Sequence, residues 1–149
     1  MYEKVLVPLD GSEFSECSLA HVKAIAKKFQ VAEVVVLHVM DEPTPSSSVY
    51  GRAAQELYRS RDGEIRSYLQ RVAGDLKAEG IPAQPLVVSG NAAEEILNYV
   101  RDNNVDLVIM STHGRSGVTR WALGSVAERV LRHSPTAVLT SSPKECRIA

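Results

Sequence analysis

Small residues near the C-terminal end of the sequence have the spacing of a phosphate-binding loop. Residues 113–125 read HGRSGVTRWALGS, with Gly114, Gly117 and Gly124 followed directly by Ser125. Glycine permits positive φ values and close approach, so that several backbone N–H groups can converge on one phosphate. A helix that begins at Gly124 and Ser125 would add the favourable partial charge of its N-terminus. The stretch is therefore a candidate for phosphate binding.

The same residues also permit a purely structural interpretation. Ser125 is an ordinary N-cap residue, and Glu128 follows three positions later, as in a capping box. From the residues alone, phosphate binding and turn-and-cap chemistry are equally favoured. The sequence contains neither G-x-x-x-x-G-K-[ST] nor G-x-G-x-x-G, which excludes P-loop NTPases and ordinary dinucleotide-binding proteins.

Apolar runs alternate with helical patterns along the chain and predict the elements that position this stretch. Strands are expected at Lys4–Val7, Glu33–Met40 and residues 83–89, 105–112 and 136–141. Helices are expected from Ser12, over Ala53–Glu79 with a break near Gly63, after an N-cap at Asn91, and from about Ser125. This alternation predicts a single α/β domain over residues 1–149, with a mostly parallel sheet and right-handed crossovers.

Ligands of such sheets bind beyond the carboxyl ends of the strands. Two of these ends carry distinctive residues, namely PLDGS at residues 8–12 and STHG at residues 111–114. If the first and fourth strands are neighbours, the site lies between them. Asp10 is the acidic candidate there, and its alternative role is to start a turn or to cap the first helix.

Composition limits the classes of function. The 149 residues carry a formal net charge of −1, so there is no overall basic field to hold nucleic acid or an anionic membrane. No stretch approaches the roughly 18 apolar residues of a membrane span. Cys17 and Cys146 have neither zinc-site spacing nor the pattern of a disulfide framework, so we expect a cytoplasmic protein. Residues 41–51, DEPTPSSSVYG, are expected to form a flexible loop.

Several motifs together resemble a known family. Residues 111–125 read S-T-H-G-(RSGVTRWAL)-G-S, and three further stretches are KVLVPLDGSEFSECSLAHVKAIAK, VVVLHVM and GSVAERVLRHSPTAVLT. With these motifs the chain resembles the nucleotide-binding branch of the universal stress proteins, which carries G-x-x-G-(nine residues)-G-[ST]. Gly114, Gly124 and Ser125 are in register with that motif. Ser111 stands in place of its first glycine.

This resemblance implies a fold, a ligand and a set of contacts. The fold would be flavodoxin-like, or adenine-nucleotide α-hydrolase-like, with strand order 3-2-1-4-5. The ligand would be ATP, or else ADP or AMP, with Mg or Mn bridging phosphate oxygens and no metal ligand from the protein. Pro8, Leu9 and Asp10 would line the adenine and ribose, Val39 and Met40 would contact adenine, Met110 and Ser111 would flank the ribose, and Gly114, Arg115, Gly124, Ser125 and Val126 would hold the phosphates.

Three functions compete. The first is an ATP-binding regulatory or stress-resistance module, which the resemblance implies to be a homodimer paired through Thr136–Ser141. The second is a slow ATP-hydrolysing enzyme. The sequence contains no G-x-S-x-G, H-E-x-x-H or S-G-G-x-D-S motif, so at most weak ATPase activity is expected. The third is an interaction module without nucleotide, and the presence of Gly114, Gly124 and Ser125 argues against it.

Overall fold

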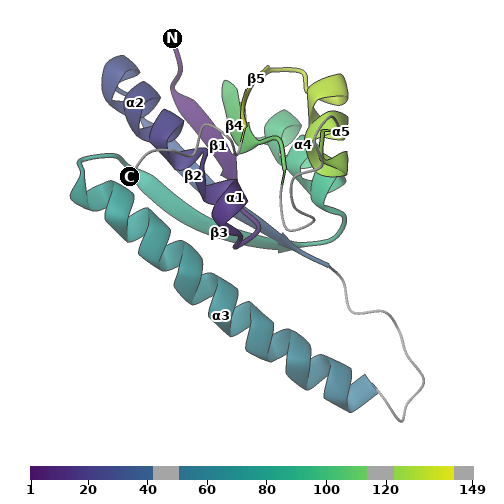
Figure 1. Cartoon of the computed structure of the whole chain (residues 1–149). Coiled ribbons are helices and arrows are strands. Elements are labelled where there is room, and N and C mark those ends of the chain that lie inside the picture. Colours follow the sequence, from purple (N-terminus) through teal and green to yellow (C-terminus); the bar gives the residue numbers. More distant parts are fainter. Residues whose placement is uncertain (42–50, 114–122, 143–149) are drawn as a thin grey trace.

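The computed structural model describes residues 1–41, 51–113 and 123–142, and its centre is a five-stranded sheet (Figure 1). The strands lie in the order β3-β2-β1-β4-β5, and every pair is parallel. The α/β class and the predicted order 3-2-1-4-5 are therefore confirmed. The strands are β1 (Lys4–Pro8), β2 (Glu33–Met40), β3 (Ala83–Ser89), β4 (Leu107–Ser111) and β5 (Ala137–Ser141).

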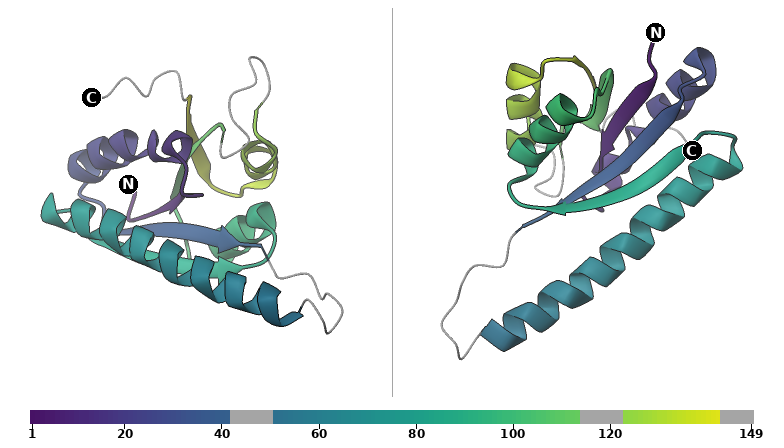
Figure 2. Two further views of the ribbon diagram at one scale, coloured as in Figure 1. Left: turned by 60° about the horizontal axis from the view of Figure 1, so that its bottom comes forward. Right: turned by 180° about the vertical axis from the view of Figure 1, so that it is seen from behind.

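Helices cover both faces of the sheet (Figure 2). Side chains alternate along a strand, so Val5 and Val7 pack against α2 and α3 while Leu6 packs against α4 and α5. Two apolar layers result, one on each face of the sheet. The helices are α1 (Glu13–Glu16), α2 (Leu19–Phe29), α3 (Gly51–Ala78), α4 (Ala92–Asp102) and α5 (Ser125–His133).

The helix expected from Ser12 is two helices in the structure. The N-cap is Ser12, whose hydroxyl accepts a hydrogen bond from the Ser15 N–H at 3.2 Å. The fully buried Ser18 donates its hydroxyl to the carbonyl of Ser15 at 2.8 Å, at the point where α1 ends. Such back-bonding competes with the helix ladder, and this explains the break between α1 and α2. The break expected near Gly63 is absent, because α3 is continuous there.

The environment of Cys17 corrects another expectation. Cys17 ends α1 and is disulfide-bonded in the structure, so the expectation drawn from the cysteine spacing is wrong for this residue. The other cysteine of the sequence, Cys146, lies outside the described residues.

Two further expectations concern the loop at residues 41–51 and membrane spans, and both can be compared with the described residues only. The predicted loop at 41–51 falls on residues 42–50 except for its two ends, so its flexibility stays a prediction. Among the described helices, none is both long enough and apolar enough to cross a membrane.

Candidate functional site

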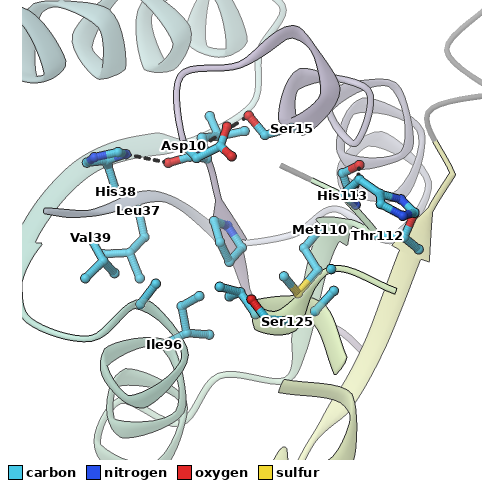
Figure 3. A pocket seen from close by; sticks show the side chains of 17 residues that line it. Asp10, Ser15, Leu37, His38, Val39, Ile96, Met110, Thr112, His113 and Ser125 are labelled. Atoms are coloured by element: carbon cyan, nitrogen blue, oxygen red, sulfur yellow. Dashed lines mark hydrogen bonds between the residues drawn. The ribbon is translucent and has the colours of Figure 1, made fainter. Parts of the chain in front are cut away.

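A cavity of about 270 Å³ lies at the carboxyl ends of β1 and β4 (Figure 3). The chain leaves β1 toward α1 on one face of the sheet and leaves β4 toward α5 on the other, which is the switch point where α/β proteins bind ligands. Nine of the predicted site residues line this cavity: Pro8, Leu9, Asp10, Val39, Met110, Ser111, Gly124, Ser125 and Val126.

The first turn of α5 tests the structural interpretation of Ser125 as an N-cap residue. Gly124 is the N-cap, no side chain caps the helix, and Ser125 is already its first residue. The Gly124 N–H donates to the Thr112 carbonyl at 2.7 Å, which ties the start of α5 to the end of β4. The capping-box interpretation is therefore wrong, because Ser125 lies one position too late to cap the helix.

This start leaves backbone donors open toward the cavity. The first bond of the α5 ladder runs from the Glu128 N–H to the Gly124 carbonyl at 2.9 Å. Helix geometry gives the N–H groups of Ser125, Val126 and Ala127 no acceptor within the helix, and none is found elsewhere in the described part of the chain. All three residues line the cavity. Open N–H groups at a helix N-terminus and the helix dipole favour a negative charge.

Glycine is required at position 124 because there is no room for a side chain, and not because of the backbone conformation. Its φ of −59° is open to any residue. A Cβ atom at this position would lie 2.8 Å from the carbonyl oxygen of Thr112, closer than real Cβ atoms approach. A side chain here would push the start of α5 away from the end of β4.

Asp10 combines its two predicted roles. One carboxylate oxygen accepts from the N–H of Ser12 at 2.9 Å and from the Ser12 hydroxyl at 2.5 Å. These bonds form the turn that starts α1, as the structural alternative predicts. The residue still lines the cavity, across from Ser125 (Figure 3). The turn thus fixes the carboxylate at the cavity wall.

His38 is a buried histidine with a backbone partner. It is 5% exposed, and its Nδ1 donates to the Leu9 carbonyl at 2.7 Å. This bond ties the end of β2 to the segment after β1. His38 also lines the cavity.

The remaining predicted residues lie elsewhere. Met40 does not line the cavity; it lines a second groove, under α3, because consecutive residues of β2 point to opposite faces. Gly114 and Arg115 lie outside the described residues. Within the described ranges, no group of three His, Cys, Asp or Glu side chains is arranged to hold a metal ion.

Sequence reasoning missed several lining residues. Ala92 and Ile96 reach the cavity from the first turns of α4, and Leu37 reaches it from β2. The helical periodicity predicts that Ile96 faces inward. It cannot show that this part of the apolar core borders a cavity. Ser15, Thr112 and Ala127 were also missed, and His113 lines the cavity as well.

Comparison with known proteins gives matches along the whole chain. Residues 1–141 match the universal stress protein family. The universal stress protein MJ0577 of Methanocaldococcus jannaschii is 33% identical over 158 aligned residues, which cover 97% of each chain. A solved structure of MJ0577 superposes with a TM-score of 0.84 at 34% identity and covers 95% of this chain and 96% of that one.

Two more distant structures share the fold and contain nucleotides. One is a universal stress protein in complex with cAMP, which is 22% identical with a TM-score of 0.69 and covers 95% of this chain and 98% of that one. The other is a family protein of Arabidopsis thaliana with AMP bound, which is 17% identical with a TM-score of 0.65 and covers 93% and 90%. At these identities the likeness concerns the fold.

Proposed function

This chain belongs to the universal stress protein family, and from that premise we propose that it binds an adenine nucleotide, ATP in the first place. The nucleotide occupies the cavity at the carboxyl ends of β1 and β4. Binding makes the protein a nucleotide-responsive regulatory module for stress resistance. The cAMP and AMP complexes of distant relatives support the ligand class.

The uncapped start of α5 is the observation that carries this proposal. The N–H groups of Ser125 and Val126 supply neutral donors for phosphate oxygens, and the Ser125 hydroxyl adds another. Because Gly124 has no side chain, the helix start stays close to β4. A divalent ion bound with the nucleotide would neutralise phosphate charge, and its ligands would be phosphate oxygens and water.

The rest of the cavity suits the adenosine part of the ligand. Leu37, Val39 and Ile96 form an apolar wall for the adenine ring. Asp10 accepts hydrogen bonds, so it can receive one from a ribose hydroxyl or from the adenine amino group.

We place the protein among binding modules rather than enzymes. Two titratable side chains that line the cavity, Asp10 and His38, already hold backbone and hydroxyl groups in place. These hydrogen bonds give Asp10 and His38 a role in positioning the segment after β1. Slow hydrolysis of ATP would then be a side activity, and nucleotide occupancy would carry the signal.

Two measurements test nucleotide binding. Protein purified without added ligand is denatured, and its supernatant is run on ion-exchange chromatography; we expect adenine nucleotide at about one per chain. The stripped protein is then titrated with ATP by calorimetry, with and without magnesium or manganese. Absence of both nucleotide and binding heat would contradict the proposal.

Homodimer formation through the last strand belongs to the same proposal. β5 lies at an edge of the sheet, and its Val138 and Leu139 are only partly buried. An exposed apolar edge strand is a natural pairing surface. Light scattering coupled to chromatography is expected to give the mass of a dimer. A monomer mass that does not change with concentration would exclude pairing.

The proposed location is the cytoplasm, and the disulfide at Cys17 is the observation against it. Cytosolic disulfides are rare because the compartment is kept reducing. Alkylation of thiols at lysis followed by mass spectrometry measures the state of Cys17 in the cell. A reduced thiol supports the cytoplasm, and an oxidised one contradicts it.

A further inference from the structure

The N-terminal half of α3 extends beyond the sheet (Figure 1). The helix has 28 residues and is therefore about 42 Å long. The longest strand, β2, has 8 residues and spans about 27 Å. The buried residues of α3, from Leu69 to Leu76, all lie in its C-terminal half. The N-terminal half contains no buried residue.

Beneath this half lies an open groove of about 750 Å³. One wall is the helix face that carries Tyr58 and Glu64. The opposite wall is formed by the turn after β1, with Asp10, and by the end of β2, with Met40 and Asp41. This volume lies within the range of small-molecule sites, about 300–1,000 Å³.

Two tyrosines hold the helix over the groove. The Tyr68 hydroxyl donates to Glu16 of α1 at 2.9 Å, and the Tyr58 hydroxyl bonds with the Ser89 hydroxyl at the end of β3. Burial, followed by the bond to Glu16, raises the pKa of Tyr68. Tyr68 therefore remains a donor at any physiological pH. The groove is thus bounded by specific contacts and does not depend on helix stiffness alone.

The lining of the groove is acidic. Asp10, Asp41 and Glu64 contribute three carboxylates, against one guanidinium from Arg61. Within the described part of the chain, Asp41 and Glu64 make no hydrogen bond or ion pair. Like charges that face one groove repel each other and favour a cation between them.

Apolar surface lies beside these charges. Leu57 is 54% exposed and lines the groove together with Met40 and Ile65. The ring of Tyr58 adds an aromatic surface to the same helix face. A ligand that matches this lining carries an apolar or aromatic body and a positive charge, since aromatic faces also attract cations.

We propose that the groove beneath α3 is a second ligand site, specific for organic cations that carry an amine on an apolar or aromatic body. The amine lies between Asp41 and Glu64, and the body packs on Leu57 and Tyr58. This site is distinct from the nucleotide cavity and does not require nucleotide binding. The two share Asp10 and His38 as lining residues, so the test relies on groove residues that the cavity does not use.

The test compares two probes of one shape and opposite charge. Tryptamine carries an ammonium group and indole-3-propionate carries a carboxylate on the same ring system. Each is titrated into ¹⁵N-labelled protein while amide shifts are recorded by NMR. We expect tryptamine to cause saturable shifts at Asp41, Leu57 and Glu64, and to bind at least about fivefold more tightly than the anion. Equal affinities, or shifts away from the groove, would overturn the proposal.

Variants link the effect to the groove. The double variant Asp41→Asn with Glu64→Gln is expected to weaken tryptamine binding about five- to tenfold, because each exposed pair contributes up to about 1 kcal/mol. The matched control is Glu56→Gln with Asp75→Asn, which also removes two negative charges, at exposed residues of α3 that do not line the groove. Equal weakening by both pairs would mean that only the overall charge matters and would overturn the proposal.

Discussion

The starts of α4 and α5 offer a direct comparison within one layer of the fold. Both helices follow a parallel strand, pack on the same face of the sheet and line the same cavity. Asn91 caps α4 by accepting from the Glu94 N–H at 3.1 Å. Gly124 precedes α5 and supplies no side chain. A single cap residue thus separates a helix with a capped N-terminus from one whose first N–H groups stay open to the cavity.

The largest effect is expected from Gly124→Ala. The added Cβ would lie 2.8 Å from a backbone oxygen that cannot easily move, so the open N–H groups of α5 are displaced. We expect ATP affinity to fall by about 100-fold, which is about 2.7 kcal/mol. Calorimetry measures the affinity, and thermal unfolding checks the fold.

Gly74→Ala is the matched control for that change. A Cβ at Gly74 meets nothing within 4 Å. We expect unchanged ATP affinity and a stability gain of about 0.5–1 kcal/mol, because alanine is favoured over glycine inside a helix. If both variants retained full affinity, the open start of α5 would not be the phosphate site.

Ser125→Ala sharpens the comparison by removing one donor and leaving the backbone intact. A hydrogen bond to a charged group contributes about 1.5–3 kcal/mol, so ATP affinity is expected to fall at least about tenfold. Stability is expected to stay the same, because the Ser125 hydroxyl does not cap α5. A drop in the midpoint of urea unfolding would show that the hydroxyl serves the fold instead.

The opposite outcome is expected for Asn91→Ala. Loss of an N-cap costs about 1 kcal/mol of folding free energy, while ATP affinity stays within about twofold. Urea unfolding and calorimetry on the same preparation measure the two quantities. Affinity that fell together with stability would mean that α4 contributes to the site through its N-terminus as well.

The smallest effect is expected for a substitution far from both helix starts, at Glu79, and it concerns the stability of the fold. Hydrogen bonds from Lys23 and Lys27 lower the pKa of this carboxyl from 4.5 to about 2. A pKa that is lower in the folded state stabilises the fold above pH 4.5, and this contribution is lost as the pH falls through about 2. Glu79→Gln should therefore lower the unfolding midpoint slightly at pH 7 and leave it unchanged near pH 2. An equal difference at both pH values would contradict the ion pairing.

The sequence predicts the fold well because its strongest signals are local. The continuous apolar run Glu33–Met40 gives β2 with its observed bounds. Asn91 and Glu94 predict the observed cap of α4. The break between α1 and α2 was not predicted, because it depends on the Ser18 hydroxyl turning back to the Ser15 carbonyl.

The site is predicted less completely, because its details depend on contacts between distant segments. Gly124 is a candidate from spacing, yet the need for glycine follows from the Thr112 carbonyl beside it. Val39 and Met40 look equivalent in sequence, but Val39 lines the cavity and Met40 lines the groove on the other side of β2. The second groove has no sequence signature, since it results from the length of α3 relative to the strands.

The central position of β1 has a consequence for biosynthesis. β1 leaves the ribosome before the other described strands and pairs early with β2, whereas its other neighbour is β4, through the register Val5 with Leu107. Until that part of the chain is made, a nascent half-sheet carries an unpaired β1 edge, the kind of surface that chaperones protect and that aggregates when left bare. The two strands whose ends frame the cavity thus meet late in translation, so a ribosome-bound fragment that ends before Leu107 lacks one wall of the cavity.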